Sequence, residues 1–119
     1  MCDRFDSSTW AYQICAGEHS ELAAPFRELR MRLVSRVCSP DLYVVFDLEP
    51  AISRARVMGD GTRTELSVMD QKPLEYYVRV RAGFKEFAGA YPVSIIEAHQ
   101  APEYVFEQFI SALKMKGII

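Results

Sequence analysis

The stretch that decides the fold is SPDLYVVFDLEP, residues 39–50, where a run of apolar residues lies between two proline-containing turns. Every side chain from Leu42 to Phe46 is apolar, and several are β-branched or aromatic, which favours a strand. A strand without polar alternation is expected to be covered on both faces, as in parallel sheets. VSIIEA, residues 93–98, predicts a second such strand. Two apolar strands connected by helical segments predict an α/β fold with a parallel sheet.

Helices are predicted around both strands. A short helix is expected over residues 7–15 and a longer one over 20–37, where apolar residues recur every three or four positions. Further helices are expected over 50–57, 74–91 and 101–115. The periodic residues expected to face the core are Leu22, Phe26, Leu29, Leu33 and Val37 in the second helix and Tyr104, Val105, Phe109, Ile110 and Leu113 in the last.

Composition limits the class of protein. The chain has 119 residues, half of them apolar, which predicts one domain over residues 1–119. Its net charge of −2 argues against nucleic-acid binding and against a basic membrane-surface protein, and its apolar runs are too short to cross a bilayer. Three cysteines, Cys2, Cys15 and Cys38, show no CxxC spacing, so we expect reduced thiols, no metal-ligating residues and a cytoplasmic location.

Four segments carry motifs that occur together in one family. CDRFDSSTWAYQ (2–13) pairs Asp-Arg with a following Ala-Tyr-Gln, and the run from 39 to 65 joins Pro-Asp-Leu, a strand, Arg-Ala-Arg and a glycine-containing loop. YYVRVRAGF (76–84) and IIEAHQAPEYV (95–105) complete the set. In this order and spacing the segments resemble thymidylate kinases, and the resemblance covers nearly the whole chain.

The resemblance implies a fold and a reaction. It implies the C-terminal part of a P-loop NTPase-type fold, with an incomplete parallel sheet of two to three strands flanked by helices. It also implies phosphoryl transfer from ATP to dTMP with Mg²⁺. The sequence contains no G-x-x-x-x-G-K-[ST] motif, the loop that cradles nucleotide phosphates in such enzymes. We therefore expect negligible kinase activity from these 119 residues alone.

The acceptor site implied by the resemblance lies in the first segment. Arg4 would hold the dTMP phosphate, which suits the two-pronged guanidinium, and Asp3 would help organise the magnesium and phosphate region. Tyr12 would lie against the deoxyribose, with Thr9 at the thymine edge and Gln13 beside that pocket. Without the resemblance, the same segment is typical of a helix cap, a surface arginine and a core tyrosine.

A lid over ATP is implied at about residues 58–71. Arg63 would close over the ATP phosphates, although Met58 and Thr62 stand where the family usually has a basic residue and an aspartate. The residues assigned to the ATP side and the lid are Arg54, Arg56, Arg63 and Glu65. Read without the resemblance, this arginine-containing loop is a solvated loop.

Several alternatives stay open from the sequence. The chain could be one half of a split enzyme completed by a partner, or a non-catalytic module that associates with itself through an exposed strand edge, including as a homodimer. Asp47 and Glu49 could act in acid–base chemistry or order magnesium. Arg79 and Arg81 are interpreted as structural or solvated residues, with contact to the nucleotide as the alternative.

Overall fold

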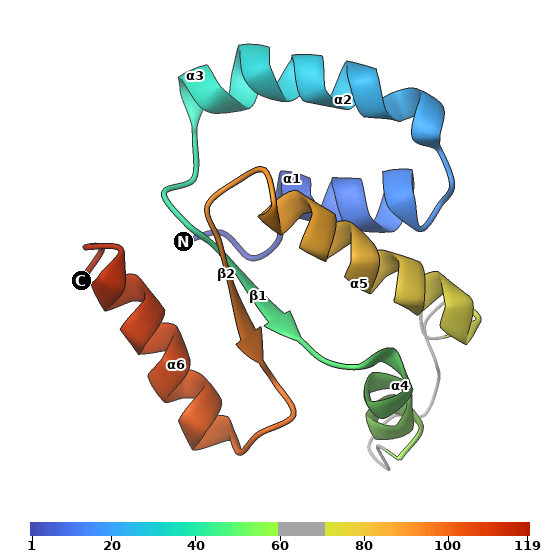
Figure 1. Cartoon of the computed structure of the whole chain (residues 1–119), viewed down its shortest axis with the longest axis vertical. Coiled ribbons are helices and arrows are strands. Elements are labelled where there is room, and N and C mark those ends of the chain that lie inside the picture. Colours follow the sequence, from blue (N-terminus) through green and yellow to red (C-terminus); the bar gives the residue numbers. More distant parts are fainter. Residues whose placement is uncertain (60–70) are drawn as a thin grey trace.

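The computed structural model describes residues 1–59 and 71–119, which form a mixed α/β structure. In these residues, β1 (Tyr43–Asp47) and β2 (Val93–Glu97) form a two-stranded parallel sheet, with Tyr43 opposite Val93 and Asp47 opposite Glu97. Helices flank the sheet on both faces (Figure 1). The prediction of an α/β fold with a short parallel sheet is confirmed. Most of the predicted lid, with Arg63 and Glu65, lies outside the described residues.

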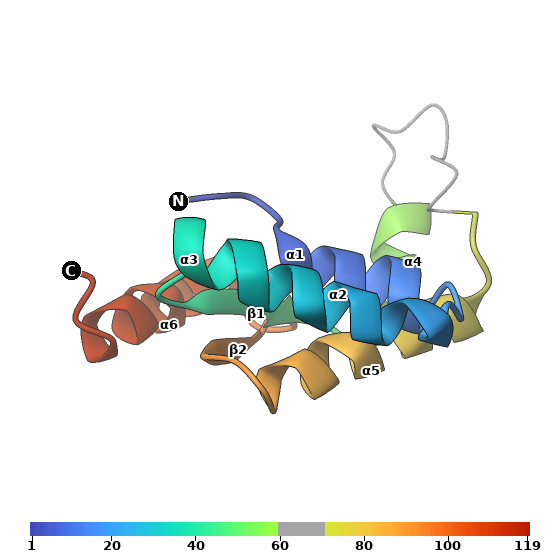
Figure 2. The same ribbon diagram turned by 90° about the horizontal axis from the view of Figure 1, so that it is seen from above.

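The helical segments follow the predicted order. Residues 6–15 form one continuous helical stretch, here called the N-terminal helix, and residues 20–37 form another, here called the second helix (Figure 2). Each of the two contains π-helical turns. No helix in the described ranges is long and apolar enough to span a membrane. The helical bounds are α1 (Asp6–Ser8), η1 (Thr9–Cys15), η2 (Ser20–Leu22), α2 (Ala23–Leu29), η3 (Arg30–Val34), α3 (Ser35–Val37), α4 (Pro50–Met58), α5 (Leu74–Ala88) and α6 (Pro102–Met115).

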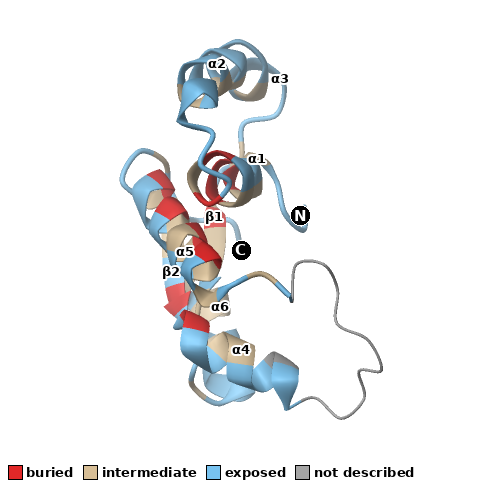
Figure 3. Cartoon of the chain, turned by 90° about the vertical axis from the view of Figure 1, so that its right-hand side faces the viewer, coloured by how far each residue is buried: buried red, intermediate tan, exposed pale blue. Residues whose placement is uncertain are grey.

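The core forms where α5 crosses the N-terminal helix over one face of the sheet (Figure 3). A Cβ atom added at Gly83 of α5 would lie only 2.9 Å from the Cα of Ala11, so the absence of a side chain lets the two backbones approach closely. The buried residues of this crossing form two adjoining clusters, Trp10, Ile14, Tyr43 and Phe87 in one and Ala11, Ala16, Tyr76 and Val80 in the other.

The opposite face of the sheet is less well covered than the sequence predicts. Phe46 points to the α6 side, where its ring lies 6.1 Å from that of Phe109, yet Phe46 remains 53% exposed. The expectation that the first strand is buried on both faces is therefore wrong at Phe46. The apolar run predicts the strand correctly, but coverage depends on elements that lie elsewhere in the sequence.

The prediction of which residues of the second helix face the core is also wrong for most of them. Phe26 packs against Trp10, but the other four predicted residues are exposed: Leu22, Leu29, Leu33 and Val37, the last by 81%. The helix reaches the core along one edge, which carries Ala23, Phe26, Arg27 and Arg30. In α6, the predicted inner residue Tyr104 is exposed as well, while the other four are half-buried.

Candidate functional site

The N-terminal turn brings two predicted acceptor-site residues together. Arg4 has a φ of 66°, in the left-handed region that residues other than glycine rarely adopt. Its guanidinium carbon lies 5.6 Å from the centre of the Tyr12 ring, within the range of a cation–π interaction. Within residues 1–59 and 71–119, no acceptor bonds to this guanidinium, and the residue is exposed. The turn thus presents an exposed cation above an aromatic ring.

Tyr12 is fixed by its packing against α5. Its ring meets Phe84 edge to face at 5.9 Å, and its backbone carbonyl accepts a hydrogen bond of 3.0 Å from the Tyr76 hydroxyl. Burial raises the pKa of the Tyr76 phenol, which favours the protonated form that can donate. The remaining predicted acceptor-site residues, Asp3, Thr9 and Gln13, are exposed in the same turn and helix.

A closed ring of hydrogen bonds lies at the start of the N-terminal helix. Arg30 donates from Nε to Asp6 Oδ2 at 2.7 Å and from Nη2 to the Tyr43 hydroxyl at 3.0 Å. That hydroxyl donates to Asp6 Oδ1 at 2.7 Å. Burial raises the pKa of the Tyr43 phenol to about 12, with a further rise from Asp6 and an opposing effect from Arg30. No local sequence pattern predicts this ring, because its members lie 13 to 37 positions apart.

The ATP-side residues that the structure describes lie on α4. Arg54 is half-buried, and Arg56 is exposed and donates from Nη1 to the backbone carbonyl of Ala98 at 3.3 Å. This bond links α4 to the loop that follows β2. No described hydrogen bond, ion pair or ring contact joins Arg54 or Arg56 to Arg4. The predicted site residues that are described therefore fall into two groups.

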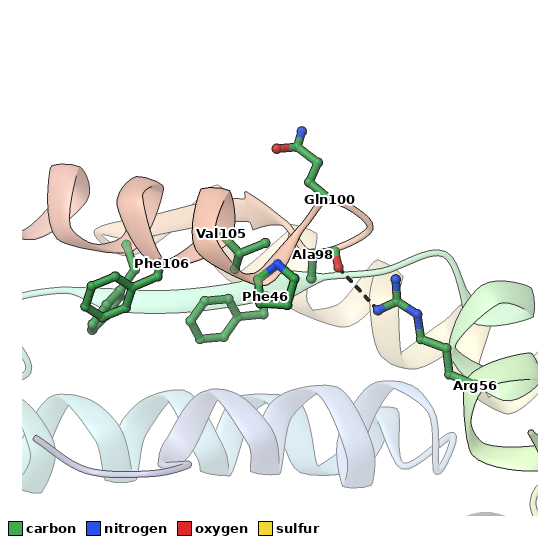
Figure 4. Close-up of a pocket in the computed structure, with 8 residues that line it drawn as sticks. Phe46, Arg56, Ala98, Gln100, Val105 and Phe106 are labelled. Atoms are coloured by element: carbon green, nitrogen blue, oxygen red, sulfur yellow. Dashed lines mark hydrogen bonds between the residues drawn. The ribbon is translucent and has the colours of Figure 1, made fainter. Parts of the chain in front are cut away.

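A groove of about 400 Å³ opens beside Arg56 at the carboxyl ends of the two strands (Figure 4). In open α/β sheets, ligands bind at this end of the strands. The side-chain oxygen of Gln100 is buried and has no hydrogen-bond partner within the part of the chain that the structure describes. The lining residues are mostly apolar: Phe46, Arg56, Ala98, Gln100, Pro102, Val105, Phe106 and Phe109.

Asp47, at the end of β1, is engaged by an arginine of α5. Arg81 donates from Nε and Nη2 to the two carboxylate oxygens at 2.9 and 3.0 Å, a two-pronged ion pair. The hydrogen bonds from Arg81 lower the pKa of the Asp47 carboxyl. Arg79 donates from Nε to the carbonyl of Ala16 at 3.1 Å, near the end of the N-terminal helix. Both arginines thus contact protein groups, in line with their structural interpretation.

The described residues offer little to a bare magnesium ion. No group of three or more His, Cys, Asp or Glu side chains in residues 1–59 and 71–119 is arranged to hold a metal ion. Asp47 is committed to Arg81, which leaves Asp3 as the carboxylate of the predicted acceptor site. Magnesium usually keeps several waters and is bound through one or two carboxylates plus substrate phosphates. Among the described residues of the predicted acceptor site, Asp3 is therefore the carboxylate that could contact such an ion.

Parallel strands flanked by helices, with a groove at the carboxyl ends of the strands, define an α/β protein. No family model matches the chain. Individual relatives do match it, and they share one name.

The relatives are thymidylate kinases. The chain is 30% identical over 122 residues to the thymidylate kinase of Desulforapulum autotrophicum. The matched region covers 98% of this chain and 52% of that protein. The chain is 33% identical over 113 residues to the enzyme of Solidesulfovibrio magneticus, covering 90% and 53%, and 28% identical over 118 residues to that of Bacillus thuringiensis, covering 98% and 55%. The predicted resemblance is confirmed: this chain is a relative of the thymidylate kinases and spans about half of their length.

Proposed function

We propose that this chain supplies the acceptor-nucleotide wall of a thymidylate kinase, in which a phosphoryl group passes from ATP to dTMP. The observation that carries the proposal is the similarity to proteins named thymidylate kinase over 98% of the chain. Phosphoryl transfer depends mainly on positioning and on neutralising charge on phosphate oxygens. An exposed arginine held above an aromatic ring, as Arg4 is above Tyr12, suits both tasks.

The acceptor-side roles are those that the resemblance implies, and the geometry of the N-terminal turn supports them. Arg4 binds two oxygens of the dTMP phosphate through its guanidinium, and Tyr12 supports the sugar from below. Asp3 lies beside the phosphate. Thr9 and Gln13, exposed on the same helix, face the base edge.

The ATP side is proposed at α4 and the groove next to it. Arg54 and Arg56 face the ATP phosphates, together with Arg63 and Glu65 from the predicted lid. The apolar groove beside Arg56 takes the base, because its volume of about 400 Å³ and its place at the strand ends fit a flat heteroaromatic ring. Magnesium, bound to the ATP phosphates, would neutralise part of their charge.

Binding of dTMP tests the acceptor site directly. We expect Arg4→Gln to weaken dTMP affinity about 10- to 100-fold in isothermal titration calorimetry, because a charge-assisted hydrogen bond contributes about 1.5–3 kcal/mol. Arg32→Gln is the matched control, since Arg32 is exposed and pairs with Glu28 on the same helix. Equal losses in the two variants, or no loss in either, would contradict the proposed acceptor site.

An assay of turnover tests whether the chain supplies only the acceptor-nucleotide wall and needs a phosphate-binding loop from elsewhere. The 119 residues should show no detectable phosphoryl transfer in a coupled assay, because their sequence contains no G-x-x-x-x-G-K-[ST] loop to hold the ATP phosphates. Addition of a chain that carries such a loop should restore turnover. Activity of the isolated 119 residues comparable to that of an intact enzyme would overturn this expectation.

A second candidate function is association through the sheet edge, with or without catalysis. Within the described residues, β1 pairs with β2 on one side only, and the Phe46 side chain is more than half exposed. An unpaired edge beside an apolar surface is a template for another strand. Sedimentation should then show a concentration-dependent dimer, and the absence of any dTMP affinity in that dimer would favour a non-catalytic module.

A further inference from the structure

The ring formed by Asp6, Arg30 and Tyr43 joins three segments that are far apart in the sequence. Asp6 begins the N-terminal helix, Arg30 lies in the middle of the second helix, and Tyr43 begins β1. Both oxygens of the Asp6 carboxylate are engaged, one by Arg30 and one by Tyr43. The Tyr43 hydroxyl both accepts from Arg30 and donates to Asp6, so each side chain contacts the other two. Such a ring fixes its members in distance and in orientation.

The aromatic side chains of Phe87 and Tyr91 lie beside this hydrogen-bonded ring and help to shield it from water. The Arg30 guanidinium carbon lies 3.7 Å from the centre of the Tyr91 ring and 5.9 Å from that of Phe87. The side chains of Arg30 and Asp6 are each only 10% exposed. A hydrogen-bonded ion pair with little solvent around it is stronger than a surface pair and costly to break on one side. Arg30 is therefore occupied by protein groups and is not itself available to bind a phosphate.

The ring lies two residues from the turn that presents Arg4. Arg4 is held at a φ of 66°, a conformation that a non-glycine residue keeps only when its surroundings fix it. The helix that starts at Asp6 has no side-chain cap, so its first residue is fixed by the ring instead. On the other side of the turn, the Cys2 thiol donates to the Arg4 carbonyl at 3.2 Å. The ring is thus the strongest described anchor next to the strained residue.

We propose that Arg30 and Tyr43 are positioning residues: through Asp6 they hold the N-terminal turn so that the Arg4 guanidinium stays above Tyr12. The inference depends on the proposed function in one respect, the assignment of Arg4 to the acceptor phosphate. The positioning of Arg4 above Tyr12 is argued from the structure alone. Arg30 acts with both prongs of its guanidinium, one on Asp6 and one on Tyr43. Lysine, which presents a single ammonium group, cannot reproduce this geometry.

The test compares Arg30→Met, Arg30→Lys and Tyr43→Phe with the control Arg32→Met on the same helix. The first readout is the Arg4 Nε–H signal in a ¹H–¹⁵N spectrum, assigned by its loss in Arg4→Lys and shifted in the parent chain by the Tyr12 ring. We expect Arg30→Met to move this signal to the position of a free arginine and Arg32→Met to leave it unchanged. Arg30→Lys and Tyr43→Phe should give intermediate positions. The Trp10 indole signal reports on the core and should stay in place in every variant.

The second readout is dTMP affinity by titration calorimetry. Arg30→Met should weaken it at least about tenfold and Tyr43→Phe about threefold, in the same order as the shift of the Arg4 signal. If Arg30→Met does not fold, Tyr43→Phe decides the question, since its ring can still pack against Phe87. Unchanged Arg4 signals in the folded variants would overturn the inference. A parent chain that shows the shifted Arg4 signal but binds no dTMP would instead refute the proposed function, and the Arg4 signal alone would then decide the positioning role.

Discussion

The two faces of the sheet differ in how completely the described residues cover them. On the α5 side, Tyr43 and Phe87 stack edge to face at 5.0 Å, and Phe87 is only 2% exposed. On the α6 side, Phe46 and Phe106 are 53% and 62% exposed, and they line an open groove. The same residue type is thus a core residue on one face and a surface residue on the other.

The difference shows which part of the structure is stabilised by its own packing. Burial of apolar surface stabilises roughly in proportion to the area removed from water, so the α5 face contributes most of the hydrophobic stabilisation. The α6 face leaves apolar area exposed, which is the usual mark of a ligand or partner surface. Three predictions, taken from the largest expected effect to the smallest, can break or sharpen this contrast.

The contrast itself predicts unequal effects of two alanine substitutions. Phe87→Ala should lower the free energy of unfolding by about 3–5 kcal/mol, because it leaves a cavity in the buried cluster. Phe106→Ala should change it by less than about 0.5 kcal/mol, because its ring is already largely in water. Urea denaturation followed by circular dichroism measures both, and a single transition is expected if residues 1–119 form one domain. Similar losses in the two variants would abolish the distinction between the faces.

The helix crossing on the α5 side predicts a smaller effect at a glycine. Gly83→Leu should destabilise the chain by about 2 kcal/mol, because even a Cβ at this position would lie 2.9 Å from the Ala11 backbone and force the helices apart. Gly89→Leu is the control, since a Cβ there meets its nearest atom at 3.4 Å and the φ of −73° suits any residue. Thermal unfolding of both variants measures the difference. Equal melting temperatures would show that the crossing tolerates a side chain.

The ion pair between Asp47 and Arg81 predicts the smallest effect and a dependence on pH. Because the pKa of Asp47 is lower in the folded chain than its unfolded value of about 3.9, the stabilisation is fully present above that value and is lost as pH falls through the folded pKa. Asp47→Asn should cost about 1 kcal/mol at pH 7, a modest value because Arg81 is 34% exposed.

Urea denaturation at pH 7 and between pH 5 and pH 2 measures this prediction. The difference between the parent chain and Asp47→Asn should shrink as the pH falls, whereas the exposed Asp41→Asn should match the parent at pH 7. A difference that stays constant down to pH 2 would mean that the charge of Asp47 is not the cause.

The local pattern of the sequence predicted the secondary structure well. The strand predicted at 42–46 is β1 at Tyr43–Asp47, and the helix predicted over 20–37 matches the second helix at both ends. Proline-containing turns and apolar runs act over a few neighbouring residues, so they can be recognised without the rest of the fold. The order of motifs likewise predicted the similarity to thymidylate kinases, now confirmed by relatives.

Only the tertiary structure decided which apolar residues are buried and which polar residues meet. Leu29 and Leu33 have the period of a core face, yet they are exposed because the second helix meets the core along one edge. Asp6, Arg30 and Tyr43 carry no common motif, and their ring exists because chain segments up to 37 positions apart fold together. Burial and hydrogen bonding between distant segments depend on the three-dimensional path of the chain, which no local pattern contains.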